Sequence, residues 1–395
     1  MSRFPSPWRS PVMAAVICAL TIVPAASGAA TTTAAAATAA VTTAAVTSSA
    51  PTAVPKTFKA ASISWLSAKQ GWVLGSAACG KKSCATVVGT TDGGTKWSRV
   101  GSMPVPLANG STPSDVGVNG VRFASATVGW AFGPALFHTG NGGRSWTRSL
   151  VPGGGKQVLA LAVTKTSAYA VVSPCKEFAA TCKAKTLSLW RDGSLTGQHW
   201  ARISLHLGIN SFANIAAFGS TVYVVDPGVP GTLDASTDGL HFSARPSPCD
   251  AAQGVGLAQA VPTSAADVAL LCNGNPGISK ATKTVYRSVN TGKTDTSAGT
   301  TGPLGISADL AAAPSGSLLV GAWANGSWMY LNDSHKTKWS TVLALGDGGA
   351  GFRDLTFVTS KIAWVVYGPV SDFSADFGKL YTSGDGGTTW RLVTP

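Results

Sequence analysis

The stretch Ser383-Gly384-Asp385-Gly386-Gly387-Thr388-Thr389-Trp390 lies close to the C-terminus and indicates the fold of the whole chain. It predicts a tight turn between two strands, because Asp385 can accept hydrogen bonds from backbone N–H groups while Gly386 and Gly387 permit a positive φ. Trp390 supplies a large apolar ring to cover the turn. The same pattern, named here the Asp turn, recurs at Thr90-Thr91-Asp92-Gly93-Gly94-Thr95-Lys96-Trp97 and at Thr139-Gly140-Asn141-Gly142-Gly143-Arg144-Ser145-Trp146. Three copies in one chain predict a repeat architecture.

Four weaker Asp turns lie between the sharp copies. They end at Trp200, Phe242, Asp295 and Trp339, so one of them has an aspartate in place of the aromatic residue. Asp238 opens the turn that ends at Phe242. The seven turns end at positions 97, 146, 200, 242, 295, 339 and 390, with a mean spacing of (390 − 97)/6, or about 49 residues. A period of that size is typical of repeat proteins.

Each Asp turn follows apolar runs of strand length that are separated by turn-forming residues. The clearest pairs are residues 63–66 and 71–75, 121–124 and 129–133, and 355–358 and 363–367, and weaker runs lie at 169–172, 222–225, 268–271 and 318–321. With the strands that enter and leave the Asp turn, each repeat supplies four strands. This predicts an all-β protein, a seven-bladed β-propeller of four-stranded blades. The alternative is a row of separate small sandwiches, which the even spacing and the lack of linkers disfavour.

The composition agrees with many short strands joined by tight turns, since the chain has 46 glycines, 22 prolines and 13 tryptophans. The net charge of +13 comes from missing acids rather than from basic clusters. Glu177 is the only glutamate, and no Lys/Arg run is longer than the pair Lys81-Lys82. Nucleic-acid binding requires a concentrated basic stripe, so no nucleic-acid partner is expected. Weak attraction to an anionic cell envelope or polysaccharide is favoured instead.

The N-terminal region divides by composition into two segments. Residues 1–29 have the features of a signal peptide: Arg3 and Arg9, then an apolar run at 12–26, then small residues. Residues 30–57 form an Ala/Thr-rich linker that we expect to be disordered, either bare or carrying O-linked sugar, before the propeller at 58–395. An uncleaved membrane anchor is the alternative, but the apolar run is short of the ~20 residues that a span needs. We therefore expect a secreted or extracellular protein, either free or held at the cell envelope, with no transmembrane segment in its mature chain.

The cysteines agree with export. Apart from Cys18, the chain has six cysteines, and their positions predict the disulfides Cys79–Cys84, Cys175–Cys182 and Cys249–Cys272. The third would join the end of blade four to the second strand of blade five. A metal site is the competing interpretation, but the five histidines do not cluster near these cysteines. No metal and no cofactor are expected.

The Asp turns resemble the BNR, or Asp-box, repeat of sialidases and related secreted propellers. Together with the preceding Phe/Trp-x-Ser and Gly-Trp strands, the body from about 58 to 395 resembles BNR-like propellers of the photosystem II assembly/stability-factor type. The likeness is sharp in blades one, two and seven and faint in blades three to six. In that family the Asp boxes sit in peripheral hairpins remote from any active site. The resemblance therefore implies that Asp92, Asn141, Asp238 and Asp385 are structural.

Sialidase chemistry is not expected. That family uses an arginine triad, a Tyr–Glu nucleophile pair and an aspartate acid/base, with an Arg-Ile-Pro segment near its start. This chain has Arg202-Ile203-Ser204 in mid-chain, and its one glutamate lies in the predicted Cys175–Cys182 loop. A glycoside hydrolase that uses two of the sixteen aspartates remains the alternative function. No residue is assigned a catalytic role.

The propeller model sorts the loops onto two faces. The links from first to second strand are short and share a face with the Asp turns. The opposite face, named here the long-loop face, collects the long connections and all three predicted disulfides, which makes it the expected binding face. The long connections are 76–84, 101–120, 173–185, 226–232, 245–258, 272–284, 299–308 and 368–379.

Candidate binding residues follow from this sorting. Four polar residues fall at the starts of inner strands, near the mouth of the central channel: Arg122, Asp309, Arg353 and Asp354. The loop 367–377 adds Asp372, Phe373 and Asp376, and Trp323 and Trp328 are expected to be exposed on the same face. Trp65, Trp72, Trp130 and Trp364 are expected to pack between blades. The leading hypothesis is an exported, monomeric, non-catalytic propeller that binds a protein or cell-surface glycan through this face.

Overall fold

The structure, a computed structural model, describes residues 52–108, 117–175, 184, 186–208, 213–333, 336–346, 350–368 and 378–395. The predicted signal peptide and nearly all of the predicted linker lie outside these residues. So do Cys182, Asp372, Phe373 and Asp376. The chain contacts the propeller from Thr52 onward, where the Thr52 carbonyl accepts a hydrogen bond of 2.8 Å from the Arg99 N–H.

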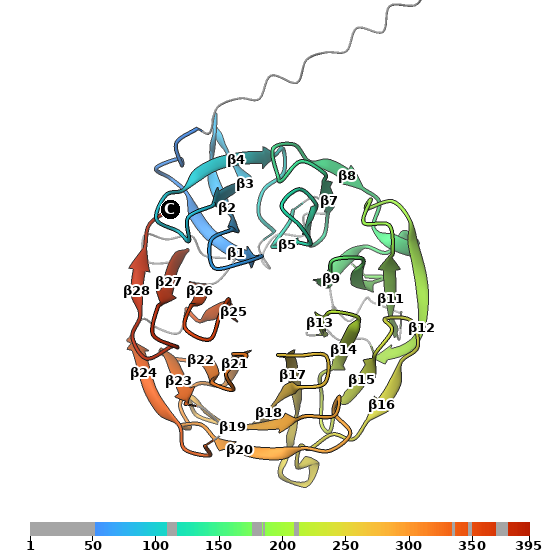
Figure 1. The fold of residues 1–395 in the computed structure, drawn as a ribbon, viewed down its shortest axis with the longest axis vertical. Coiled ribbons are helices and arrows are strands. Elements are labelled where there is room, and N and C mark those ends of the chain that lie inside the picture. The colour runs from blue at the N-terminus through green and yellow to red at the C-terminus, as the bar shows by residue number, and fades with distance from the viewer. Residues whose placement is uncertain are drawn as a thin grey trace, which may run out of the picture. The chain divides into compact units, whose positions relative to one another are not determined.

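Seven four-stranded antiparallel sheets stand in a ring, which confirms the predicted seven-bladed β-propeller (Figure 1). In every sheet the strands pair in chain order. Blades one to four are built from β1 (Lys59–Trp65), β2 (Gly71–Cys79), β3 (Lys82–Thr90) and β4 (Ser98–Met103); β5 (Gly120–Phe123), β6 (Gly129–Phe132), β7 (Leu136–Thr139) and β8 (Thr147–Ser149); β9 (Gln157–Val163), β10 (Ala168–Ser173), β11 (Thr186–Asp192) and β12 (Trp200–Gly208); and β13 (Asn214–Phe218), β14 (Thr221–Asp226), β15 (Thr232–Ser236) and β16 (Ser243–Arg245).

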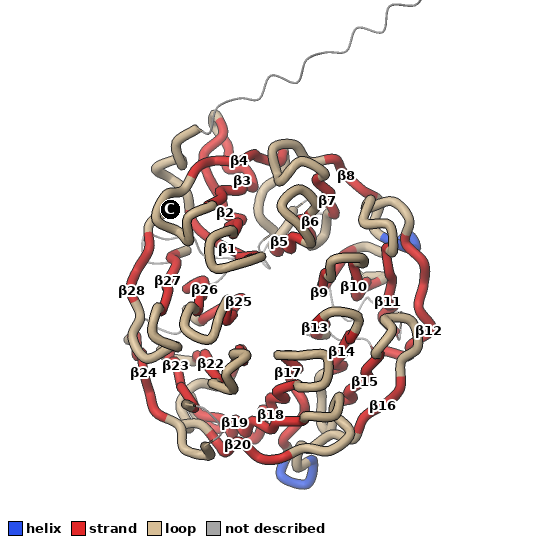
Figure 2. The backbone as a smooth tube through the Cα atoms, in the orientation of Figure 1, coloured by secondary structure: helices blue, strands red, loops and turns tan. Residues whose placement is uncertain are grey.

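Blades five to seven complete the ring. They are built from β17 (Val255–Pro262), β18 (Val268–Gly277), β19 (Lys280–Ser288) and β20 (Thr296–Thr300); β21 (Ser307–Ala312), β22 (Leu318–Trp323), β23 (Ser327–Asn332) and β24 (Ser340–Leu345); and β25 (Phe352–Phe357), β26 (Ala363–Tyr367), β27 (Lys379–Ser383) and β28 (Arg391–Val393). The helices of the described residues are the 3-10 turns η1 (Pro152–Gly154) and η2 (Ala251–Gln253). Figure 2 shows the first strand of each blade nearest the centre of the ring and the fourth at its rim.

The Asp turns have the predicted geometry. Asp385 Oδ1 accepts hydrogen bonds from the Ser383 hydroxyl at 2.8 Å and from the Thr389 N–H at 2.9 Å. Ser383 Oγ accepts the Gly387 N–H at 2.8 Å, and the indole of Trp390 donates to the Gly387 carbonyl at 3.0 Å. Gly387 has φ of 96°. The Asp385 turn is therefore closed by its own backbone and side chains.

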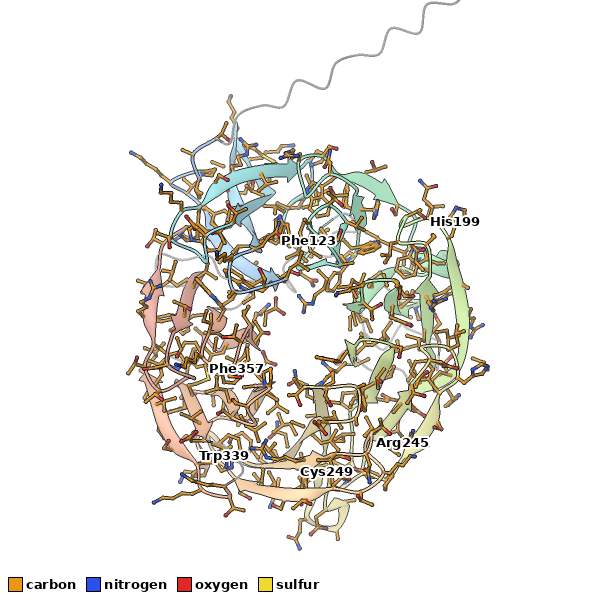
Figure 3. The ribbon with its side chains drawn as sticks, in the orientation of Figure 1. Phe123, His199, Arg245, Cys249, Trp339 and Phe357 are labelled. Atoms are coloured by element: carbon orange, nitrogen blue, oxygen red, sulfur yellow. A yellow bond between two sulfur atoms is a disulfide. The ribbon has the colours of Figure 1, made fainter. Side chains whose placement is uncertain are left out.

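Aromatic rings fill the wedges between blades, as predicted for Trp65, Trp72 and Trp364. Trp72 stacks on Phe123 with ring centroids 3.9 Å apart, and Trp65 stacks on Trp364 at 4.6 Å. Trp130 is fully buried in the core between blades two and three. Figure 3 shows Phe123 and Phe357 well inside the rim, where His199 and Arg245 lie.

Two predicted disulfides are confirmed. Cys79 and Cys84 bridge the β2–β3 hairpin with Cα atoms 5.8 Å apart, and Cys249 is bonded to Cys272 of β18 with Cα atoms 5.5 Å apart. Cys175 is disulfide-bonded, but its predicted partner Cys182 lies outside the described residues.

Two of the predicted long loops are in fact hairpins. Residues 76–84 and 272–284 continue the β2–β3 and β18–β19 pairs almost to their tips. The small and β-branched residues of these segments pair across the hairpins, and Gly80 turns the first with φ of 66°. Breaker residues such as Gly274 and Pro276 suggested loops, but β18 includes them.

The hydrogen bonds sort the two faces as predicted. In four blades an Asp turn bonds to the link between the first two strands of the same blade: Gly93 N to Lys69 O, Gly142 N to Thr127 O, Thr291 N to Ala266 O, and Gly386 N to Lys361 O. The face that carries the Asp turns is therefore closed by short turns. The long-loop face carries the connections between blades and the two described disulfides.

Candidate functional site

A cavity of about 650 Å³ lies among the inner strands and is lined by residues of all seven blades. Its volume falls in the range of small-ligand pockets. Most of its lining comes from the first halves of inner strands, next to the connections between blades, which places it toward the long-loop face. Figure 1 shows β25 across the ring from β9 and β13. The predicted residues Arg122, Asp309, Arg353, Asp354 and Trp323 all line this cavity.

Asp354 and Arg122 form an ion pair in the cavity wall. Arg122 Nη2 lies 2.9 Å from Asp354 Oδ1, and the two side chains are 32% and 20% exposed. Asp354 Oδ2 also accepts hydrogen bonds from the Ser62 hydroxyl and from the Ile63 N–H. Burial raises the pKa of the Asp354 carboxyl, but the Arg122 charge and these hydrogen bonds outweigh it and hold the pKa below its usual range. Asp354 is therefore a carboxylate whose two oxygens are both engaged by blades one and two.

β-Bulges bring side chains to the cavity. The register of the inner strand shifts in four blades, and at each shift an unpaired residue lines the cavity: Ala61, Leu159, Ala258 and Asp354. Asp354 alone of these has a positive φ, 49°. Such a conformation costs about 1 kcal/mol or more outside glycine and clusters at functional sites. In β25 the bulge allows the adjacent residues Arg353 and Asp354 to line the cavity together.

Asp309 continues the polar wall toward blade five. Its Oδ1 accepts from the Gln259 amide at 2.9 Å, and its Oδ2 accepts the Leu355 N–H at 3.0 Å. Gln259 Oε1 in turn accepts the Leu310 N–H at 2.8 Å. Burial raises the pKa of Asp309 to about 6, and the negative charge of Asp354 adds to that rise. A polar belt therefore runs from blade five through blades six, seven and one to blade two.

Arg353 differs from the other charged residues of the belt. Arg122 donates five hydrogen bonds, to Asp354, Ser62, Ile63 and Val121. Arg353 lines the same cavity, yet within the described part of the chain its guanidinium makes no hydrogen bond or ion pair. Burial lowers the pKa of Arg353, and the charges of Asp354 and Asp309 oppose this. Arg353 is thus a half-buried cation with its donors free.

The opposite side of the cavity is mostly apolar. Blade three contributes Leu159, Ala160 and Leu161, and blade four contributes Ala213 and Ile215. Asn214 is the polar exception on these two strands. The cavity is therefore amphipathic, with a charged wall on one side and an aliphatic wall facing it.

The prediction that Trp323 and Trp328 are exposed is wrong, and the other three predicted residues lie outside the described ranges. Trp323 and Trp328 are half-buried rather than exposed. The Trp323 ring lies against Gly351, and Trp328 packs on the core between blades five and six. They were predicted as exposed because they flank a short turn, but both rings fold back onto the blades. Asp372, Phe373 and Asp376 lie outside the described residues.

The sequence interpretation missed the neutral members of the belt. Ser62 and Gln259 connect the two carboxylates to blades one and five. Neither stood out, because serine and glutamine inside a strand are unremarkable without knowledge of the bulge beside them. The aliphatic wall was also missed, since its residues resemble any other inner strand.

No group of three or more His, Cys, Asp or Glu side chains in the part of the chain that the structure describes is arranged to hold a metal ion. No helix there is long and apolar enough to cross a membrane.

Comparisons with known proteins add the following. No family model matches the chain, and no curated protein matches it. Among solved structures, "YCF48 bound to D1 peptide" is 17% identical with a TM-score of 0.44, and the match covers 69% of this chain and 79% of that chain. YCF48 from Cyanidioschyzon merolae is 16% identical with a TM-score of 0.45, covering 70% and 85%. The GH74 enzyme of Niastella koreensis is 11% identical with a TM-score of 0.34, covering 85% and 71%. Likenesses of this size say nothing of ligand or activity.

Proposed function

We propose that this chain is an exported, non-catalytic propeller that captures an extended segment of a protein partner on its long-loop face. Disulfides are typical of exported proteins, and the N-terminal 29 residues have the pattern of a signal peptide. Association with the cell envelope and a monomeric state belong to the same proposal.

The division of the two faces carries this proposal. One face is closed by bonds between short turns, whereas the other holds the cavity, the disulfides and the tips of two hairpins. Val229 and Ile278 lie at the β14–β15 and β18–β19 connections on the long-loop face and are 57% and 93% exposed. Exposed aliphatic groups on the face that also holds the cavity suit a protein segment. A glycan is the less favoured partner, since Trp323 and Trp328 are half-buried and present no open stacking platform.

Glycoside hydrolysis is the second candidate, and one observation favours it. Asp309 and Asp354 line one cavity and have pKa values moved in opposite directions, as an acid and its partner carboxylate require. Against it, every carboxylate oxygen of the pair accepts a hydrogen bond from the protein. Carboxylate oxygens that already accept hydrogen bonds from the protein are less able to donate a proton to a substrate or to attack it, so a structural role is favoured.

Three parallel experiments test the proposal. A random-peptide display library panned against the folded protein should enrich a related set of sequences, and a glycan array should remain without signal. Incubation with a broad glycoside panel should release no product. Hydrolysis that Asp309→Asn and Asp354→Asn both abolish in folded protein would establish the second candidate and contradict the first.

A further inference from the structure

A strained bulge in β25 places Arg353 in the cavity. Its guanidinium makes no hydrogen bond or ion pair with the described residues. The bulge in β25 and the positive φ of Asp354 bring the two residues side by side along the cavity wall. The Asp354 carboxylate accepts hydrogen bonds from Arg122, Ser62 and Ile63, whereas the N–H groups of the Arg353 guanidinium donate to no group in the described residues. A guanidinium in a partly buried cavity with no protein acceptor is a site for an anion that comes from outside.

The charges around Arg353 limit the anion to a single negative charge. Arg122 and Asp354 neutralise each other. The remaining charged groups that face Asp309 are Arg353 and Asp354 of β25 and Arg122 of β5, while its partner Gln259 of β17 is neutral. With Asp309 protonated the belt has one net positive charge, and with Asp309 ionised it has none. A dianion would meet two nearby carboxylates and one free cation, which disfavours it.

The wall opposite Arg353 is aliphatic, which indicates that the part of the ligand beyond its anionic group is apolar. Leu159, Leu161 and Ile215 lie on β9 and β13, across the ring from β25. An aliphatic chain attached to the anionic group would bury its apolar surface against these side chains, which favours binding. The cavity of about 650 Å³ has room for such a chain.

We propose that the central cavity binds a free organic acid, with its carboxylate on the Arg353 guanidinium and its aliphatic chain against β9 and β13. The planar guanidinium matches a carboxylate with two parallel N–H···O bonds. This site is separate from the protein segment proposed above, which docks on the loops, so either can stand without the other.

Octanoate is the probe that tests this site, and isothermal titration of the full chain at pH 5.5 is the measurement. We expect saturable binding of octanoate with one site per chain. Octanol, which has the same chain without the charge, should bind about tenfold more weakly or not at all, because a charge-assisted hydrogen bond contributes about 1.5–3 kcal/mol. Equal binding of octanol, or no binding of octanoate, would overturn the proposal.

Variants locate the site. Arg353→Gln should weaken octanoate binding about tenfold or more, with an unchanged melting temperature, since Arg353 bonds to no other group among the residues that the structure describes. The matched control is Arg391→Gln, an exposed arginine on β28 of the same blade, which should bind octanoate like the wild type. If both variants bind as the wild type does, the anion does not sit on Arg353 and the assignment is wrong.

The pH dependence gives an independent readout. Octanoate should bind more tightly at pH 5.5 than at pH 7.5, because Asp309 is then largely protonated and no longer repels the carboxylate. Asp309→Asn, which removes that charge at every pH, should bind equally at both pH values. A wild-type affinity that does not change, or rises, between pH 5.5 and 7.5 contradicts the placement beside Asp309.

Discussion

Asp354 joins three blades through one carboxylate. Its partners Ser62 and Ile63 belong to blade one and Arg122 belongs to blade two, while Asp354 itself stands in blade seven. The last blade of the chain is thereby bonded to the first two. A residue with a positive φ persists only where its surroundings compensate for the strain, and these hydrogen bonds do so.

Replacing the Asp354 carboxylate tests how much it contributes to the stability of the fold. Asp354→Asn should lower the free energy of unfolding by about 2 kcal/mol, because it removes a charge-assisted bond and leaves Arg122 without its counter-ion. Urea denaturation measures the change. Asp250→Asn is the control, since Asp250 caps the exposed turn η2 and asparagine caps equally well. A loss no greater than that of the control would show that the ion pair contributes nothing.

Asp309 gives the protein a specific pH dependence. Its pKa of about 6 in the folded protein lies above the ordinary aspartate value, so the folded state keeps this proton when the unfolded chain has lost it. Its contribution to stability is fully present below the ordinary pKa and declines as the pH rises through about 6. The melting temperature of wild type minus that of Asp309→Asn should therefore be larger at pH 5 than at pH 7. A difference that is the same at both pH values would place the Asp309 pKa at its ordinary value.

The charged residues of the site could be predicted from sequence, and their neighbours could not. Arg122, Asp309, Arg353 and Asp354 stand at the starts of inner strands, and a propeller brings such positions together around its axis. What each residue does there depends on the bulge in β25 and on hydrogen bonds to distant strands. Neither the bulge nor these hydrogen bonds can be predicted from the local sequence. This is why Arg122 donates several hydrogen bonds, whereas Arg353 makes none within the described residues.

The Asp turn is the element that repeats most faithfully, and one of its sharp copies has asparagine at the aspartate position. Blade two has Asn141 in place of aspartate, and Asn141 Oδ1 still accepts the Ser145 N–H at 2.9 Å. Asp385→Asn should therefore change the free energy of unfolding by less than about 0.5 kcal/mol, whereas Asp385→Ala should cost about 1 kcal/mol. Thermal denaturation of the two variants measures both. Equal losses would mean that the side-chain oxygen does not stabilise the turn.

Turns were predicted more successfully than hairpin lengths. The Asp turns combine residues whose backbone preferences agree, so the local sequence suffices. The hairpins at 76–84 and 272–284 contain glycines that suggest breaks, yet cross-strand pairing carries both strands through them. Pairing depends on the partner strand and on a disulfide, which local propensity does not contain.

The ring closes by repeating the packing used between consecutive blades. Trp72 of blade one stacks on Phe123 of blade two with ring centroids 3.9 Å apart, and Phe123 in turn contacts Trp146 of its own blade at 6.0 Å. At the closing seam Trp364 of blade seven meets Trp65 and Trp97 of blade one. No strand is shared across the seam, because each sheet contains four consecutive strands. Closure therefore depends on side-chain packing, on the belt around Asp354 and on the hydrogen bond of 2.8 Å from the Ala60 N–H to the Gly378 carbonyl.

Truncation of the seam tryptophan tests this closure. Trp364→Ala should lower the free energy of unfolding by about 3–5 kcal/mol, the cost of a large cavity in a packed core. Gly94 lies directly under the Trp364 ring with φ of 85°, so the surroundings have little freedom to fill the space. Trp72→Ala, at the equivalent place between blades one and two, should cost a similar amount. A much smaller loss for Trp364 than for Trp72 would mean that the seam is packed more loosely than the other interfaces.

The proposed function assigns partner binding to the long-loop face, and paired variants on the two faces test this assignment directly. Val229→Lys and Ile278→Lys change exposed aliphatic residues of the long-loop face, while Leu240→Lys and Val289→Lys change residues on the Asp-turn face that are 49% and 74% exposed. The measurement is the affinity of peptides enriched by display on the wild type for each of the four folded variants. We expect about tenfold or greater loss for the first pair and wild-type affinity for the second. The reverse result, with binding lost only for the Asp-turn face, would contradict the account.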